Sequence, residues 1–245
     1  MVDHSAESLT VKEQEASQRE PRRPGGWLRK HPIRVVSAGL CVAFIAWAGF
    51  DLAGSHKTNL RDFDPDKVAG IETEMWRSYY SKRSLSLFIE LTGLMRNQYH
   101  MPFLTADLAS YHAAKSAFVF KEGHDRAEYE KALPDLVDYY SSIRRMSREP
   151  FEVDRVSRLE LEWWIVHRNR ASEPPEALQV ALARLPAELY HVPADKLMEH
   201  ARLRAEAMTI RDDKAEQGGV TEEDWARIDG LLHQSWRSLW RAVND

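Results

Sequence analysis

Apolar residues recur along most of this chain at the three- and four-residue spacing of amphipathic α-helices, but one segment breaks that pattern. Residues 35–50 read VVSAGLCVAFIAWAGF and contain no charged side chain. With its flanking positions the apolar stretch covers residues 33–54, which is about the 20 residues that a helix needs to cross a bilayer. We therefore predict that residues 33–54 form a transmembrane helix, so that the lipid bilayer is one partner of the chain.

Two other interpretations of residues 33–54 stay open. A cleavable signal peptide is favoured by the small residues of DLAGS, 51–55, although the polar residues 1–30 in front are long for a signal peptide. A helix buried inside a soluble domain would also be apolar, but such a helix seldom lacks a polar face over this length. A retained membrane anchor fits the pattern better than either alternative.

The charges on the two sides of the apolar segment predict its orientation. Residues 19–34 carry six basic side chains and one acidic side chain, a net charge of +5. The basic residues that follow the segment are diluted by Asp51, Asp62, Asp64 and Asp66. Because flanks rich in lysine and arginine stay in the cytoplasm, we expect a single-pass protein with its C-terminal domain in the periplasm or otherwise outside the cytoplasm. Residues 1–32 have few apolar groups, so they are expected to be a disordered, basic cytoplasmic tail.

Beyond residue 54 the pattern predicts helices throughout. We find no run of alternating β-branched residues, whereas helix-capping residues and prolines are frequent. The expected organisation is a linker at 55–63 and one soluble helical-bundle domain at 64–245, with about seven helices and an all-α fold.

Several boundaries of these helices are predicted by particular residues. Asp64 is expected to cap the first helix, which should run to about Gln98 with a kink or a change of buried face at the polar SKRS, 81–84. Thr105 is expected to cap the second helix. Pro134 should break the third helix into two parts, and Thr221 should cap the last one. The remaining expected helices are 153–169, one that begins at Pro174-Pro175, and one from Pro193 to Glu216.

The stretch RLELEWWIVHRNR, residues 158–170, combines two tryptophans with carboxylates, a histidine and arginines. Apolar side chains surround most of this helix, which indicates a central position in the domain. Because a buried carboxylate is costly without a partner, a cation from another helix, such as Arg204, is needed. The candidate residues for a pocket that holds a small polar ligand are Glu160, Glu162, Trp163, Trp164, His167, Arg204 and Glu206.

A purely structural role for these residues is the competing interpretation. In it the charged groups form ion pairs between helices and the tryptophans pack as core side chains that fix the helix register. We favour this interpretation, because tryptophan in helical proteins usually reports core packing.

Known catalytic, metal-binding and cofactor-binding motifs are missing from the sequence. It has no Walker-type glycine loop, no Gly-x-Ser-x-Gly and no His-Glu-x-x-His. One Glu-x-x-His pair, Glu188 with His191, would need a second copy and inward glutamates such as Glu90 to hold two iron ions, so we predict no metal and no cofactor. Residues 55–245 carry 27 basic and 32 acidic side chains, which argues against a nucleic-acid partner. Cys41 is the only cysteine, so no internal disulfide is possible.

These features favour a non-catalytic protein: a single-pass, membrane-anchored helical scaffold or accessory subunit of a membrane protein assembly. Its expected partner is another membrane protein or a second copy of the chain, since aromatic and arginine side chains are abundant. The alternative from another class is a helical-bundle enzyme or small-ligand receptor with a polar pocket between the helices.

Overall fold

The computed structural model describes residues 32–53 and 57–245. Helices make up 80% of these residues, which contain no strand, so the predicted all-α fold with one candidate membrane helix before a helical bundle is confirmed. The chain divides into two compact units, with Gly49–Asp245 as the second one. The predicted cytoplasmic tail lies almost wholly outside the described residues.

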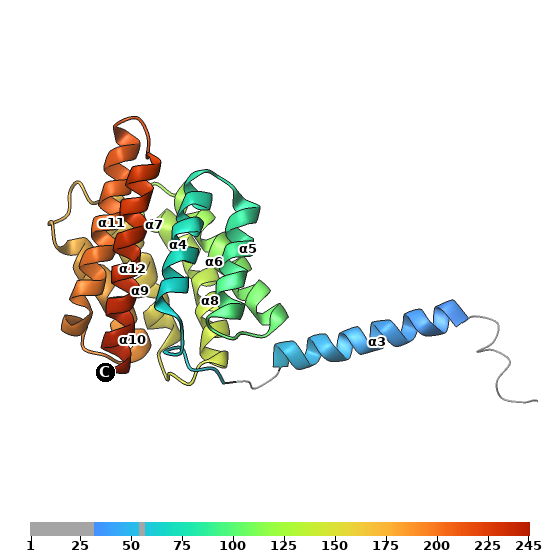
Figure 1. Ribbon diagram of the computed structural model, residues 1–245. Helices are drawn as coiled ribbons and strands as arrows, with labels where there is room; N and C mark the ends of the chain where they lie inside the picture. The colour runs from blue at the N-terminus through green and yellow to red at the C-terminus, as the bar shows by residue number, and fades with distance from the viewer. Residues whose placement is uncertain (1–31, 54–56) are drawn as a thin grey trace, which may run out of the picture. The chain divides into compact units, whose positions relative to one another are not determined.

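Helix α3 (Pro32–Ala53) is the apolar helix that the sequence predicts (Figure 1). Within it the 18 residues Val36–Ala53 are long and apolar enough to cross a membrane, and only 6% of them are buried against the rest of the protein. Large apolar side chains such as Ile33, Leu40 and Ile45 are exposed. Helix α3 thus has the length and composition of a membrane span, as the sequence predicts.

The second unit consists of helices that run alternately in opposite directions. In chain order they are α4 (Pro65–Tyr80), α5 (Ser84–Asn97), α6 (Phe103–Glu122), the short α7 (Arg126–Tyr129), α8 (Leu133–Met146), α9 (Val153–Arg168), α10 (Ala177–Tyr190), α11 (Met198–Glu216) and α12 (Glu222–Asn244). Single 3₁₀ turns, η1 (Glu130–Ala132) and η2 (Ala194–Leu197), lead directly into α8 and α11.

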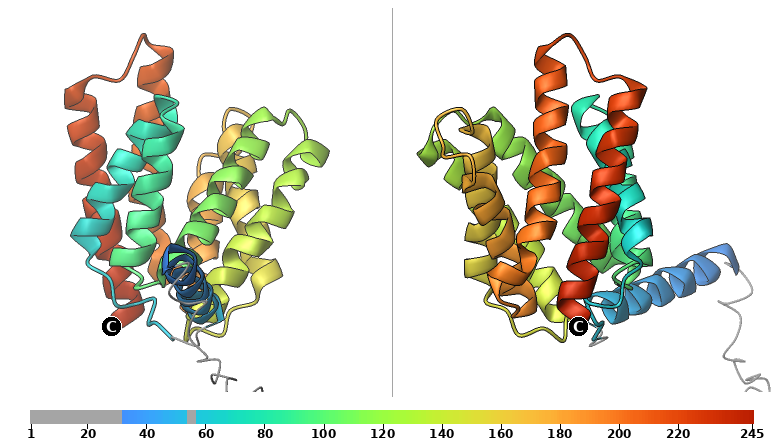
Figure 2. Two further views of the ribbon diagram at one scale, coloured as in Figure 1. Left: turned by 90° about the vertical axis from the view of Figure 1, so that its right-hand side faces the viewer. Right: turned by 60° about the vertical axis from the view of Figure 1, so that its left-hand side comes forward.

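The long helices of this unit form a closed ring. Figure 2 shows these helices from two further sides. Each of them packs on the next long helix in the chain, and α12 returns to pack on α4. Because the directions alternate, the C-terminal ends of α4, α6, α9 and α11 gather at one end of the ring, which we call the mouth. The opposite end, where the C-terminus lies, is the floor (Figure 1).

Several helix boundaries follow from local chemistry, as the sequence predicts. The Asp64 carboxylate accepts hydrogen bonds from the backbone of Asp66 and Lys67 at the start of α4. At SKRS the sequence predicts a kink within one helix, whereas the structure ends α4 at Tyr80 and begins the separate helix α5 at Ser84, with Lys82 between them in a left-handed conformation at φ 59°. Thr221 and Asp224 form a reciprocal capping box at the start of α12.

The prediction that Thr105 caps the second helix is wrong. Helix α6 begins two residues earlier, at Phe103, and the Thr105 side chain is buried. The carboxylate of Asp51 accepts from the backbone N–H groups of Leu104 and Thr105, at 3.0 and 3.1 Å. A capping group from a distant part of the chain leaves no local signal in the sequence. Helix α10 begins at Ala177, two residues after the predicted Pro174-Pro175 start.

Residues 57–63, which the sequence assigns to a linker, pack into the domain and form its floor. Leu60 and Phe63 are among the buried core residues. The Arg61 guanidinium forms an ion pair with Glu149 at 2.8 Å and donates to the backbone oxygen of Tyr190 at 2.6 Å. The folded domain therefore starts before residue 64, because two apolar side chains and one arginine in this short segment find partners on other helices.

The capping box of α12 gives a first test of the fold. Replacing Thr221 with alanine is expected to lower the free energy of unfolding by about 1 kcal/mol, because the N–H of Asp224 loses its acceptor. Urea unfolding followed by tryptophan fluorescence measures the change. Thr221→Ser keeps the hydroxyl and serves as the matched control, so an equal loss in both variants would contradict the capping role.

Candidate functional site

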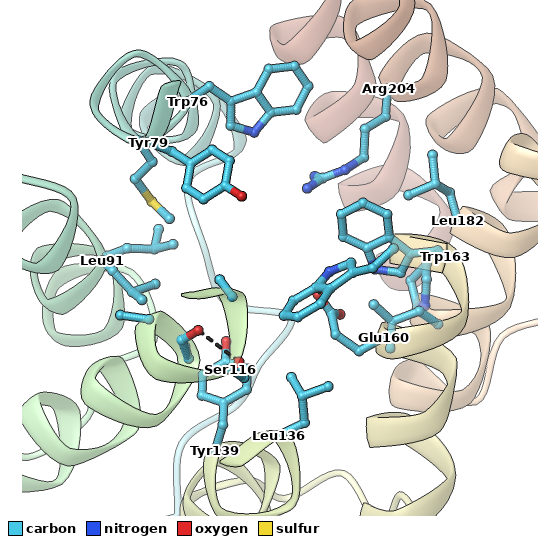
Figure 3. Close-up of a pocket in the computed structure, with 18 of the residues that line it drawn as sticks. Trp76, Tyr79, Leu91, Ser116, Leu136, Tyr139, Glu160, Trp163, Leu182 and Arg204 are labelled. Carbon is cyan, nitrogen blue, oxygen red and sulfur yellow. Dashed lines mark hydrogen bonds between the residues drawn. The ribbon is translucent and has the colours of Figure 1, made fainter. Parts of the chain in front are cut away.

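A large cavity lies inside the helical ring (Figure 3). Its volume is about 750 Å³, and each long helix of the ring contributes side chains to its wall. Most of the lining groups are aromatic or apolar. Representative ones from successive helices are Trp76, Leu91, Ala117, Tyr139, Trp163, Leu182, Met208 and Trp236.

The cavity is closed at the floor and reaches solvent at the mouth. At the floor it ends on the buried side chains of Leu60, Met146 and Tyr190. At the mouth its lining includes the exposed residues Lys82 and Arg168. The ring is thus a cup whose apolar interior is approached from one side.

The structure brings five of the seven candidate residues together. Glu160, Trp163, Trp164, His167 and Arg204 all line the cavity. The four from α9 follow the three- and four-residue steps of one helical face, so their spacing in the sequence already indicates this grouping.

The other two candidates, Glu162 and Glu206, do not line the cavity. Glu162 lies 3.1 Å from Arg126 in an ion pair, and Glu206 lies 3.2 Å from Arg202 and 3.3 Å from Arg227. Position 162 is two residues from 160, which turns its side chain to another face of α9.

Glu160 is held inside the cavity wall by neutral hydrogen-bond donors. The hydroxyl of Tyr140 and the indole N–H of Trp164 donate to its two carboxylate oxygens at 2.8 and 2.9 Å. Burial raises the pKa of Glu160, although these hydrogen bonds and the charge of Arg204 act in the opposite direction. The sequence predicts a cation as its partner, whereas the structure supplies uncharged donors.

Arg204 pairs instead with Glu72, a residue that the sequence analysis missed. The two side chains approach to 2.5 Å and are both largely buried. The indoles of Trp76 and Trp236 donate to the same carboxylate, at 3.2 and 2.5 Å. Glu72 and Trp76 are four residues apart in α4, and this spacing is a sequence signal for their hydrogen bond. The other partners of Glu72 come from α11 and α12, which no local pattern predicts.

His167 belongs to a second polar cluster, close to the mouth. Its Nε2 atom lies 2.9 Å from the carboxylate of Asp212, which also pairs with Arg211 at 2.8 Å and Arg170 at 3.4 Å. Burial alone would raise the pKa of Asp212, but the hydrogen bonds from His167 and Arg211 outweigh it, and the pKa is lowered. The carboxylate is therefore ionised and fully engaged at neutral pH.

His200 is a buried histidine that also lines the cavity and was not predicted. Its Nδ1 atom lies 3.0 Å from the backbone oxygen of Ser235 and 2.8 Å from the Ser235 hydroxyl, which itself donates to the backbone oxygen of His200 at 2.9 Å. Because a carbonyl oxygen only accepts hydrogen bonds, Nδ1 carries the proton. Burial lowers the pKa of His200 to about 3. The ring is neutral at physiological pH, and its Nε2 atom is a hydrogen-bond acceptor.

The buried His200 predicts a pH dependence of stability. Unfolded histidine takes up a proton below pH 6.5, whereas the folded ring stays neutral down to about pH 3. Between these values only the unfolded state gains the proton, so the free energy of unfolding falls by about 1.4 kcal/mol per pH unit as the pH drops. Urea unfolding from pH 7 to 4.5 measures the slope. His200→Gln should flatten it, His124→Gln at an exposed position should not, and a wild-type curve without a slope would contradict the prediction.

The possible metal ligands do not assemble a convincing site. His112, Asp135 and Asp138 hold ligand atoms within 4.8 Å of one another, but Lys115 lies 3.0 Å from Asp135 and already neutralises it.

The Glu-x-x-His pair of the sequence does not contribute ligands to this group. Glu188 forms an ion pair with Arg155 at 2.8 Å, and His191 ends α10 in a left-handed conformation. Glu90 accepts a hydrogen bond from Ser78 at 2.8 Å.

No family model, curated protein or solved structure matches this chain. The cavity and the groups that line it are therefore the features of this protein that indicate a function. A closed floor, an aromatic wall and a few fixed polar groups are features of sites that enclose a ligand.

Proposed function

We propose that this protein is a membrane-tethered receptor that encloses an apolar or amphipathic small molecule within its helical ring. The observation that carries the proposal is the cavity of about 750 Å³ with its aromatic and apolar wall. Ligand pockets commonly measure about 300–1,000 Å³, whereas protein interiors otherwise contain few voids larger than a water molecule. Removing apolar surface of a ligand from water supplies the driving force for binding.

The polar groups in the wall support the same proposal. Glu160 and Arg204 in the wall are already satisfied by protein partners, Arg204 by the buried Glu72, so the interior does not need bulk water to solvate them. His200 offers an acceptor atom to the cavity, which gives a ligand one direction for a hydrogen bond. A small number of polar groups in a mostly apolar wall orients a ligand, while binding itself does not require the ligand to be charged.

Binding of the neutral dye N-phenyl-1-naphthylamine tests the proposal. The full chain in phosphatidylcholine nanodiscs should raise the fluorescence of the dye well above the level of empty nanodiscs. Ala117→Phe puts an aromatic ring into the cavity and is expected to weaken dye binding at least about tenfold, since it displaces the ligand from apolar contacts. Ala226→Phe on the exposed face of α12 is the matched control. Equal fluorescence with and without protein would refute the proposal.

The membrane tether and its orientation are part of the proposal. Helix α3 has the length and composition of a membrane span, and the net charge of +5 on residues 19–34 favours a cytoplasmic N-terminus. The ring would then face the periplasm or the cell exterior. A reporter fused to the C-terminus should be active outside the cytoplasm, and a reporter active inside the cell would reverse the orientation.

An accessory role in a membrane assembly is a second candidate function, and one surface favours it. Helices α5 and α6 expose large apolar side chains at Leu85, Ile89, Tyr111 and Phe118. Exposed apolar groups on neighbouring helices are common where proteins meet. Cross-linking in native membranes should give a discrete larger species, which Ile89→Lys with Phe118→Lys would abolish. A chain that stays monomeric under these conditions would contradict this role.

A further inference from the structure

Positive charge dominates the residues that line the mouth of the cavity. The carboxylate of Asp212 is the one acidic group among the described lining residues at this end. The cationic side chains there come from the loop after α4 and from the C-terminal parts of α6, α9 and α11. They are Lys82, Lys121, Arg168, Arg170 and Arg211.

This charge is only partly neutralised by the protein. Asp212 is shared by His167, Arg170 and Arg211, and Arg170 also pairs with Glu216 at 2.9 Å, outside the cavity lining. Lys82, Lys121 and Arg168 form no ion pair with any residue that the structure describes. The helix dipoles do not offset the excess, because C-terminal and N-terminal helix ends alternate around the mouth.

The cations lie directly on the aromatic wall. The Arg211 guanidinium stacks 3.1 Å above the ring of Tyr80, and the guanidinium of Arg168 lies 4.8 Å from the ring of Phe120. The Lys121 ammonium lies 5.7 Å from the ring of Tyr79. Tyr79, Tyr80 and Phe120 line the cavity themselves, so positive charge borders its apolar interior without an intervening polar layer.

We infer that the ligand is an amphiphile whose anionic head group, a carboxylate or a phosphate, binds at the mouth while its hydrocarbon part fills the ring. This inference rests on the proposed function and adds the chemistry of the ligand to it. A cationic head group fits less well, because the lining carboxylates are already engaged: Glu160 by Tyr140 and Trp164, and Asp212 by His167 and Arg211. The positive charges at the mouth also attract an anion toward the opening.

Displacement of the neutral dye from the full chain in phosphatidylcholine nanodiscs separates the possibilities. The competitors are dodecanoate, dodecyl phosphate, dodecanol and dodecyltrimethylammonium, which share one hydrocarbon chain and differ in the head group. The two anions should displace the dye at about a tenfold lower concentration than dodecanol, and this advantage should shrink as salt is added. Comparing the two anions then shows whether carboxylate or phosphate is preferred.

Charge-removing variants test the mouth itself. Three substitutions together should weaken binding of both anions about tenfold, roughly twofold for each exposed charge, and leave dodecanol unchanged. They are Lys82→Gln, Lys121→Gln and Arg168→Gln. The control removes the same net charge from exposed positions outside the cavity lining: Arg184→Gln, Lys196→Gln and Arg241→Gln.

The outcomes distinguish this inference from the proposed function. If the dye does not bind at all, the receptor function fails and the head-group preference fails with it. If the dye binds but dodecanol or dodecyltrimethylammonium displaces it at the same concentration as the anions do, only the preference for an anionic head group is refuted. An equal loss of anion binding in the control variant would also refute a specific role of the mouth.

Discussion

Replacing Arg204 with alanine is expected to lower the free energy of unfolding by about 3 kcal/mol, among the largest effects of a single substitution in this protein. The change leaves the buried carboxylate of Glu72 without its counter-charge. The indoles of Trp76 and Trp236 continue to donate hydrogen bonds, but they carry no charge. Urea unfolding of the full chain in nanodiscs, followed by tryptophan fluorescence, measures the loss.

A double variant shows whether the unpaired charge is the cause. Glu72→Gln with Arg204→Met removes both charges and keeps an acceptor for the indoles, so its stability should lie within about 1 kcal/mol of the parent. Arg202→Ala breaks an exposed ion pair with Glu199 and should cost about 0.5 kcal/mol or less. A double variant as unstable as Arg204→Ala would show that packing of the arginine, rather than charge, stabilises this part of the ring.

Deleting residues 33–50 is expected to move the protein almost completely from the membrane fraction to the soluble fraction. A membrane-spanning helix anchors a chain far more firmly than a surface contact does, so its loss should be decisive. The deletion retains Asp51, whose carboxylate accepts from the start of α6, and the ring should therefore keep its fold. Extraction of membranes with alkaline carbonate, with circular dichroism of the soluble product, measures both effects.

The matched control for this deletion removes residues 2–26, which leaves the apolar segment and its nearest basic residues in place. This variant should remain in the membrane fraction. Mass analysis of the mature wild-type chain is a further check, because a chain that begins near Ser55 would identify the apolar segment as a cleaved signal peptide. A deletion variant that still pellets with membranes would show that the ring binds lipid by itself.

The separate helices were predictable because their signals are local. The capping residues Asp64 and Thr221 act within a few residues of their own positions. Thr105 shows the limit of such signals: it is a good capping residue by type, yet it lies inside α6, whose first backbone N–H groups donate to Asp51.

The candidate site was predictable only along one helix. Positions 160, 163, 164 and 167 share a face of α9 by spacing alone, and they line the cavity together. Glu162 and Glu206 were included because of their residue type, whereas helix geometry directs both toward exposed arginines. Neither Glu72 nor His200 has a sequence pattern that marks it, because their partners Arg204 and Ser235 lie on other helices.

The sequence by itself determined the helical content and the apolar segment that can span a membrane, since each depends on residues a few positions apart. Only the tertiary structure decided that α12 closes on α4, that residues 57–63 seal the floor and that cations from α6, α9 and α11 meet at one mouth. These features join side chains far apart in the chain. Whether a ring of helices closes around a hollow depends on how all their surfaces pack at once, which no local pattern encodes.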